Sequence, residues 1–341
     1  MRGLSSLYKG LSGVAPTADD IEAVKKAGDT MTGALILSGS PTEPNQAATK
    51  SYVDSNIYPA STTNQGVSYL NNPITIANNA TNPNTQMDIG AGIVDYDNGS
   101  GQLLCQAITK TLQSSGSWTA GTNQNGLDSG ARANSTLYHI FQIVKNSDNT
   151  SDILYSLSRT SPTIPSGYTL VAWIGSFRTN ASGNIDQNYL AKKTINGQIA
   201  FFKTSVFSSG STIIPIDNTI PQNTEGDQYM SIDFIPLRSK STLEIDVDTT
   251  LSFSNYGTIT MALFQDSVAN AICSKPAGFV PSANAMIGAF MRHILKSSST
   301  NLTTFKFRAG NVNAGTTYFN GNGYVLYNNT LFSSITIKEI I

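Results

Sequence analysis

The sequence has few of the residues on which most catalytic and metal sites depend. Its 341 residues include only two cysteines and two histidines, and charged residues make up 13%, against about 25% in ordinary globular chains. Cys105 and Cys273 fall in different predicted domains, which argues against a disulfide and favours two small buried apolar residues. His139 and His293 both lie in apolar contexts typical of structural histidines. We therefore expect no catalytic residue, no metal site and no cofactor.

Long hydrophobic runs and blocks of one charge are also missing. No apolar stretch approaches the length of a membrane span, and the first residues, MRGLSSLYKGLSG, have no sustained apolar segment of the kind found in secretory signals. The net charge is −1, with no basic block to neutralise phosphates. These absences argue against membrane insertion, secretion by a signal peptide and nucleic-acid binding.

The composition that remains indicates β-structure. Hydrophobic residues reach 39% and alternate with Ser, Thr and Asn, which suits strands with uncharged outward faces and polar turns rather than a disordered chain. A chain of 341 residues exceeds what one core usually holds. We predict a mainly β protein with an N-terminal helical segment over residues 1–57, a linker over 58–66 and two β-domains, 67–194 and 195–341.

The N-terminal segment contains short elements with too few apolar residues to fold alone. Two short helical patterns precede a turn at Gly28-Asp29, a brief apolar strand follows, and a further short helix covers residues 44–54. Such elements need partners, and the simplest partners are copies of the same chain. The residues predicted to form this trimerisation and anchoring surface are Leu4, Leu7, Leu11, Ile21, Val24, Met31, Tyr52, Val53 and Ile57.

The third domain has the clearest strand pattern. Apolar residues alternate with polar ones around Ile232, Ile245, Met261, Phe305 and Ile337, with little helical pattern between these segments. Strands at this spacing indicate a β-sandwich, most plausibly a jelly roll. Residues 281–296 stay open between a helical or irregular excursion and a strand. In the second domain, 169–177 is apolar on both faces and is predicted to be a buried strand.

Aromatic and amide residues gather in the C-terminal loops. Tyr318, Tyr324 and Tyr327 alternate there with asparagines, and surfaces that bind sugars need this mixture of rings and hydrogen-bonding amides. Turn chemistry with core aromatics is the alternative interpretation. Together with Arg308, these tyrosines are the candidate receptor-binding residues.

Three stretches resemble known protein modules. GDTMTG at 28–33 followed by QAATKSYVD at 46–54 resembles a module near the N-termini of bacteriophage tail-fibre and other virion-appendage proteins, with Ser51 where a second lysine is common. Words between 121 and 179, including LYHIFQIVKN and PSGYTLVAWIGSFRT, are similar to a domain of phage fibres. TTFKFRAG with the closing SSITIKEI is similar to β-sandwich tips of the same class, in which Phe319-Asn320-Gly321 belongs to the scaffold.

The resemblance implies a structural virion protein: a homotrimer, made in the host cytoplasm and mounted on the particle through its N-terminus, that contacts a host surface glycan or protein. One alternative keeps this architecture but places it on the capsid, as a head fibre or decoration protein. A glycan-degrading tailspike is a further alternative, since such enzymes use paired carboxylates. Glu244, Asp246 and Asp248 lie on one face of one predicted strand, which favours a solvated outer face.

Overall fold

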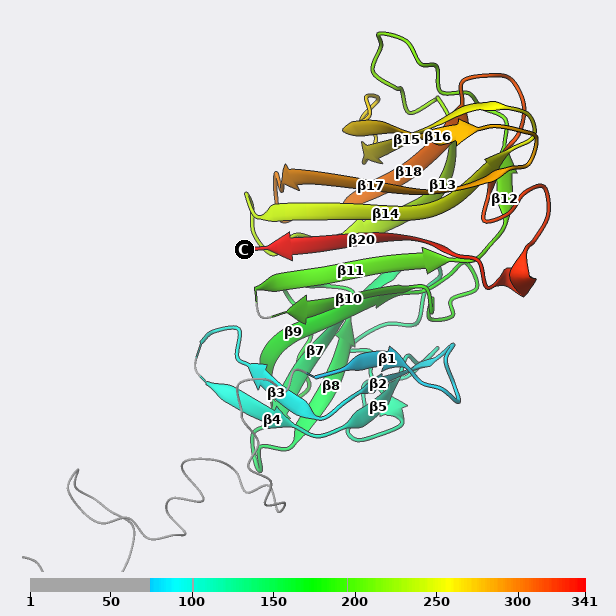
Figure 1. Cartoon of the computed structure of the whole chain (residues 1–341). Helices are drawn as coiled ribbons and strands as arrows, with labels where there is room; N and C mark the ends of the chain where they lie inside the picture. Colours follow the sequence, from blue (N-terminus) through cyan, green and yellow to red (C-terminus); the bar gives the residue numbers. More distant parts are fainter. Residues whose placement is uncertain (1–73, 100, 195) are drawn as a thin grey trace, which may run out of the picture. The chain divides into compact units, whose positions relative to one another are not determined.

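The computed structural model describes residues 74–99, 101–194 and 196–341, all within one compact unit, Ser68–Ile341. The described residues form a mainly β structure without an α-helix (Figure 1). No helix among them is long and apolar enough to cross a bilayer. The nine N-terminal residues predicted to drive trimerisation and anchoring, Leu4 to Ile57, lie outside the described residues.

One large antiparallel sheet runs through most of this unit. Along it lie β8, β7, β9, β10, β11, β20 and β14, and β17 pairs with the far side of β14. The short strands β12 and β19 extend the sheet beside the end of β14. The bounds of these strands are Leu137–Lys145 (β7), Ser151–Ser156 (β8), Tyr168–Arg178 (β9), Tyr189–Thr194 (β10), Gly197–Thr204 (β11), Ser208–Gly210 (β12), Thr242–Phe253 (β14), Met286–Lys296 (β17), Thr317–Phe319 (β19) and Ser333–Ile340 (β20).

Three smaller sheets pack with the large one. The first has the order β13-β18-β15-β16, the second β1-β2-β5-β6 and the third is the hairpin β3-β4. Their bounds are Ile76–Asn78 (β1), Gln86–Ile89 (β2), Gly92–Asp95 (β3), Gln102–Cys105 (β4), Ile108–Thr111 (β5), Gln124–Asn125 (β6), Asp227–Phe234 (β13), Gly257–Gln265 (β15), Cys273–Val280 (β16) and Thr303–Asn311 (β18). The open choice within 281–296 resolves to the strand β17 over Met286–Lys296, while 281–285 is irregular and no helix forms there.

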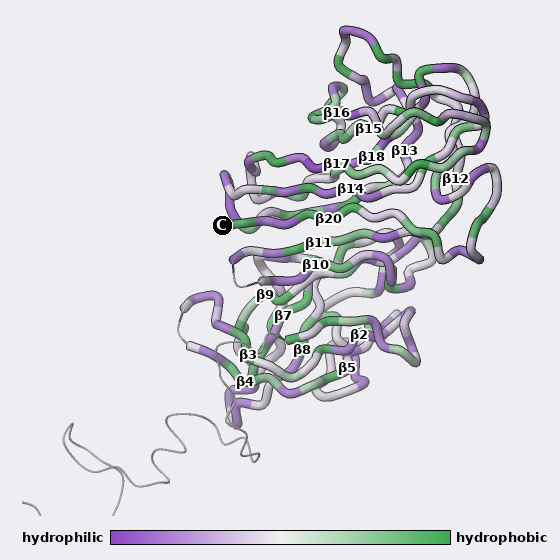
Figure 2. Tube along the Cα trace, viewed as in Figure 1, coloured by the Kyte–Doolittle hydropathy of each residue, from purple (hydrophilic) through white to green (hydrophobic). Residues whose placement is uncertain are grey.

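The main core lies between two layers. One layer is the part of the large sheet that contains β10, β11, β20, β14, β17 and β19, and the other is the sheet of β13, β15, β16 and β18. The predicted alternation is confirmed, since Ile232, Ile245, Met261, Phe305 and Ile337 are all fully buried here. Figure 2 shows hydrophilic and hydrophobic residues mixed along the strands of the large sheet rather than grouped in separate strands. Burying one row of each strand removes apolar surface from water and leaves the polar row outside.

A second core involves the strands at the other end of the large sheet. β7 and β9 are buried on both faces, because Tyr138 and Ile174 belong to one apolar cluster while Phe141 and Trp173 belong to another. The predicted buried strand at 169–177 is therefore confirmed as β9. Cys105 is buried in the first of these clusters, and burial raises the pKa of its thiol to about 12.

Cys273 is free, as is Cys105, but it is half-buried rather than buried as predicted. It opens the edge strand β16, where the pleat leaves one face in solvent.

The predicted boundary between the second and third domains falls at the turn between β10 and β11. These strands pair antiparallel, from Tyr189 opposite Phe202 to Thr194 opposite Gly197. Backbone hydrogen bonds of a single sheet thus link the segments on either side of this boundary.

We expect Phe305→Ala to lower the free energy of unfolding by about 3–5 kcal/mol, because the fully buried ring lies in the main core and its removal leaves a cavity. Phe290→Ala is the matched control, since Phe290 lies on the outward face of β17 and is 46% exposed. Its expected effect is below about 1 kcal/mol. Urea denaturation of both variants checks the prediction, and equal losses would contradict the assignment of the core.

Candidate functional site

The three candidate tyrosines share one region of the structure. Tyr318 lies in β19, while Tyr324 and Tyr327 lie in the loop 320–332 that joins β19 to β20, which we call the aromatic loop. The side chains of Tyr324 and Tyr327 are 63% and 71% exposed. Tyr318 is half-buried and stacks on Phe207, with 6.1 Å between ring centroids.

Hydrogen bonds hold the base of the aromatic loop. The buried Asn320 side chain donates through Nδ2 to the carbonyl oxygens of Thr204 and Val206, at 2.9 and 3.3 Å, and its Oδ1 accepts from Ser333 Oγ at 2.7 Å. Ser252 Oγ donates to the carbonyl oxygen of Gly321 at 2.7 Å. Buried, satisfied polar groups of this kind fix a loop in one conformation.

Gly321 is required at this base by close contacts. A Cβ atom at Gly321 would lie 2.4 Å from the carbonyl oxygen of Tyr324 and 2.5 Å from the ring of Phe207. Phe319, next to Asn320, is buried and stacks on Tyr229. The three residues Phe319-Asn320-Gly321 therefore serve the scaffold, and the exposed tyrosines lie further along the loop.

The tip of the aromatic loop has an unusual backbone. Tyr327, Asn328 and Asn329 are consecutive residues with φ of 48°, 51° and 62°. Asparagine tolerates this left-handed region, whereas tyrosine is rarely found there, and each such residue costs about 1–2 kcal/mol. The turn closes through Asn329 N to Leu326 O and Thr330 N to Tyr327 O, both at 3.1 Å. It forms a short 3-10 turn, η1 (Tyr327–Asn329), with no buried residue.

Further exposed apolar side chains lie in the aromatic loop and in the segment after β11 that contacts its base. Val325 and Phe332 belong to the aromatic loop, and Val206 lies in the segment that its base contacts. The Lys203 ammonium sits 4.3 Å from the centre of the Phe332 ring. Asn322 Oδ1 is buried and has no hydrogen-bond partner in the described part of the chain. The site therefore offers exposed aromatic faces and a cation, while the unsatisfied Asn322 acceptor lies beneath the surface.

This chemistry suits binding. The side chains of the aromatic loop are uncharged, and its sequence contains no carboxylate, histidine or cysteine. Exposed rings and amides are instead the groups that contact sugar rings and hydroxyls.

Arg308 is not brought together with the tyrosines by its contacts. It lies in β18, in the opposite sheet, and its guanidinium donates to the carbonyl oxygens of Glu225 and Gly226 at 2.9 and 2.6 Å. These bonds hold the turn before β13. Arg308 thus has a structural use in this chain, and its proposed receptor role stays a prediction.

Sequence reasoning missed Val206, Lys203 and Phe332 as members of this surface. Phe332 follows a polar stretch and resembles the start of a strand, and Val206 lies between two short strands. The exposure of such residues depends on which strands pair around them, and strand pairing cannot be predicted from the pattern of neighbouring residues.

The predicted outer face of β14 is found where expected. Glu244 and Asp246 point away from the main core and both pair with Arg292, which approaches Asp246 through two nitrogens at 2.7 and 2.8 Å. Among the described residues, no group of three or more His, Cys, Asp or Glu side chains is arranged to hold a metal ion.

His139 lies in a buried polar cluster of the large sheet. Its Nδ1 is 2.8 Å from Ser176 Oγ, which also accepts from Trp173 Nε1 at 3.2 Å. Burial, aided by the positive charge of Arg159, lowers the pKa of His139 to about 4. Ser176 is equally buried. This histidine is therefore a satisfied structural residue, as predicted.

The comparisons with known proteins add no family. No family model matches the chain, and no curated protein matches it. Among solved structures, the sugar-binding C-terminal domain of EclA aligns at 12% identity over 39% of this chain and 77% of that one, with a TM-score of 0.23. The Eiger TNF of S. frugiperda gives 13% identity, 42% and 91% coverage and a TM-score of 0.26.

The VP2 subviral particle of infectious bursal disease virus aligns more widely. It covers 84% of this chain and 80% of its own, at 10% identity and a TM-score of 0.24. TM-scores this low support no inference about function.

We expect His139 to make the protein sensitive to acid. Its folded pKa of about 4 lies below the unfolded value of 6.5, so the unfolded state binds the proton first and stability falls as pH drops from about 6.5 to about 4. The contribution is about 3 kcal/mol. As the pH is lowered between these values, the free energy of unfolding should fall less steeply in His139→Gln than in the parent.

His293→Gln is the control for this measurement, because His293 lies on the edge strand β17 and is only half-buried. The free energy of unfolding of this variant should depend on pH nearly as steeply as that of the parent. An unchanged slope in His139→Gln would contradict the assignment.

Proposed function

We propose that the chain is a homotrimeric structural protein of a phage virion, a tail fibre that contributes to attachment to the host surface through its aromatic loop. The observation that carries this proposal is a rigid base that holds a strained tip with exposed tyrosines. The three sequence resemblances to phage fibre modules give it its biological setting.

The same proposal assigns a jelly-roll fold to the C-terminal half. Ten strands contribute to the main core, and eight of them make up its two facing sheets: β11, β13, β14, β15, β16, β17, β18 and β20. Numbered along the chain from one to eight, they form one sheet in the order 1-8-3-6 and a second in the order 2-7-4-5. These two sheet orders, with only strands 4 and 5 following one another in the same sheet, support a double Greek-key sandwich of the jelly-roll type.

Attachment through this loop would work by multiplication of weak contacts. A few exposed rings and amides give poor affinity at one site, but three loops per fibre, on several fibres, raise the effective concentration of each after the first has bound. A preformed loop also loses little conformational entropy on binding, which favours a rigid base.

We expect the purified protein to compete with phage particles for adsorption to host cells. The double variant Tyr324→Ala/Tyr327→Ala should compete on the order of tenfold more weakly, because it removes the two most exposed rings of the loop. Adsorption is measured as free phage remaining after a fixed time. Tyr256→Ala is the control, since Tyr256 is 59% exposed outside this loop and should compete like the parent.

If the double variant and the parent compete equally well, the aromatic loop is not the part of the chain that contacts the host surface. No competition by an intact parental oligomer would remove host attachment from this chain and favour a capsid-mounted placement.

A second expectation concerns assembly. Deletion of residues 1–57 should leave the β-structure folded, because the described sheets and cores lie within residues 74–341. It should weaken trimerisation and incorporation into particles, since the resemblance places the anchor there. Light scattering of the purified protein and the copy number in virions test this. Normal incorporation of the shortened chain would contradict the anchoring role.

A further inference from the structure

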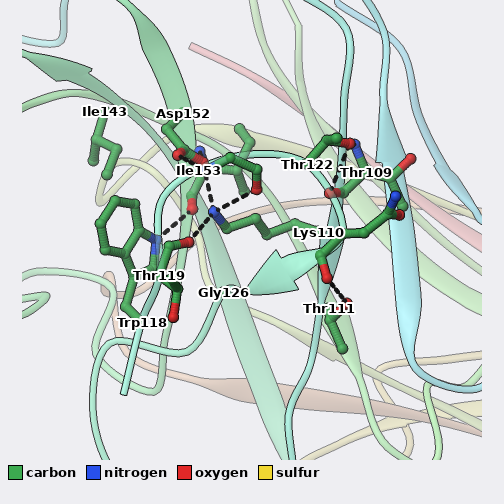
Figure 3. Close-up of polar contacts among 12 residues, drawn as sticks. Thr109, Lys110, Thr111, Trp118, Thr119, Thr122, Gly126, Ile143, Asp152 and Ile153 are labelled. Carbon is green, nitrogen blue, oxygen red and sulfur yellow. Dashed lines mark hydrogen bonds and ion pairs between the residues drawn. The ribbon is translucent and has the colours of Figure 1, made fainter. Parts of the chain in front are cut away.

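A lysine and an aspartate meet in the buried space beside the second core. Lys110 comes from β5 and Asp152 from β8, strands of two different sheets. Lys110 Nζ lies 2.7 Å from Asp152 Oδ1, and the two side chains are 0% and 4% exposed. Figure 3 shows the lysine extending from its strand toward this carboxylate.

The surroundings of the pair pack closely around it. The Lys110 ammonium lies 4.7 Å from the centre of the Trp118 ring, and a Cβ atom at Gly126 would lie 2.8 Å from Lys110 Cγ and 2.7 Å from the Tyr155 ring. Nζ has two further partners, the carbonyl oxygens of Thr119 at 2.7 Å and Gly121 at 3.2 Å.

Both oxygens of the carboxylate are held by backbone donors. Asp152 Oδ1 accepts from Ile153 N at 2.6 Å, and Oδ2 accepts from Gly121 N at 2.7 Å. Fixed N–H groups on both oxygens withdraw electron density from Cγ and stabilise negative charge that develops on either oxygen during attack. A nucleophile held in contact with its carbonyl group also reacts at a high effective concentration.

We propose that Lys110 and Asp152 condense to form an intramolecular isopeptide bond between Nζ and Cγ. A proton first passes from the ammonium to Oδ1, which leaves a neutral amine and a carboxylic acid. The amine lone pair then forms the N–C bond. One C–O bond breaks with its electron pair going to oxygen, and a second proton from nitrogen completes a departing water molecule. No oxidant, metal or further reactant is required.

The environment favours the neutral amine and the uncharged product. Burial lowers the pKa of Lys110, so the amine form is easier to reach than at the surface. Two opposite charges in a buried site are costly to maintain even when paired, and the amide carries no charge. Its remaining N–H can still donate to the carbonyl oxygen of Thr119 or Gly121, and its oxygen can keep a backbone donor.

Such a bond would tie the sheet of β5 to the large sheet at β8. It would close a covalent loop from residue 110 to residue 152 and restrict the unfolded chain, as a disulfide does. Both cysteines of this chain are free, so the bond would supply durability that disulfides do not. This inference is independent of the proposed attachment function.

The test is the intact mass of the purified full-length protein, followed by peptide mapping. We expect a mass lower than that of the sequence by one water molecule and a branched peptide that joins Lys110 to Asp152. Lys110→Arg is the matched variant, because arginine keeps the positive charge but does not form this amide. It should show the mass of its own sequence and a lower unfolding temperature than the parent.

The chain contains its own control for non-specific water loss. Lys145 and Asp148 form a pair at 2.9 Å that is close to half exposed on each side, and it should be recovered as ordinary unlinked peptides. An intact parental mass equal to that of the sequence would overturn the proposal. So would a water loss that maps anywhere other than to the Lys110–Asp152 linkage.

Discussion

The hydrogen-bonding frame around β14 is the constraint on which the candidate site depends. β14 pairs with β17 along nearly its whole length on one side, and with β20 and then β19 on the other. Its inward row, including Ile245 and Leu251, lies in the main core, so a slip by one residue would expose that row. The fixed register sets where β19 ends and β20 begins. The aromatic loop spans the interval between them, and Ser252 of β14 bonds its base.

Buried polar groups complete this frame where strands end. Glu339 of β20 is buried, and its carboxylate accepts from Gln198 Nε2 at 2.7 Å and from the backbone N–H of Leu237 at 2.9 Å. Arg159 donates to the carbonyl oxygen of Ile235 at 2.7 Å and packs on the ring of Trp173. An unpaired carboxylate at the depth of Glu339 would destabilise the fold strongly, so its hydrogen bonds also specify which segments meet.

Local pattern predicted the strands well and the surface poorly. Period-two alternation around Ile232, Ile245 and Phe305 is a property of neighbouring residues, so burial of these rows was predictable. The segment of β17 was ambiguous because its outward row includes Phe290 and Ile294, which mask the alternation. The tyrosines of the candidate site were found by residue type.

Longer-range features gave no sequence signal. The neighbours Val206 and Phe332 were not found, since exposure is decided by strand pairing. Lys110 and Asp152 lie 42 residues apart on different sheets, and no spacing rule links them. The left-handed backbone conformation of Tyr327 was also not predicted from the sequence. Folding alone gives no reason for it, because η1 buries no residue and its hydrogen bonds are local. This strain, without a packing gain inside the chain, supports the proposed role of the loop as a site preformed for an external partner.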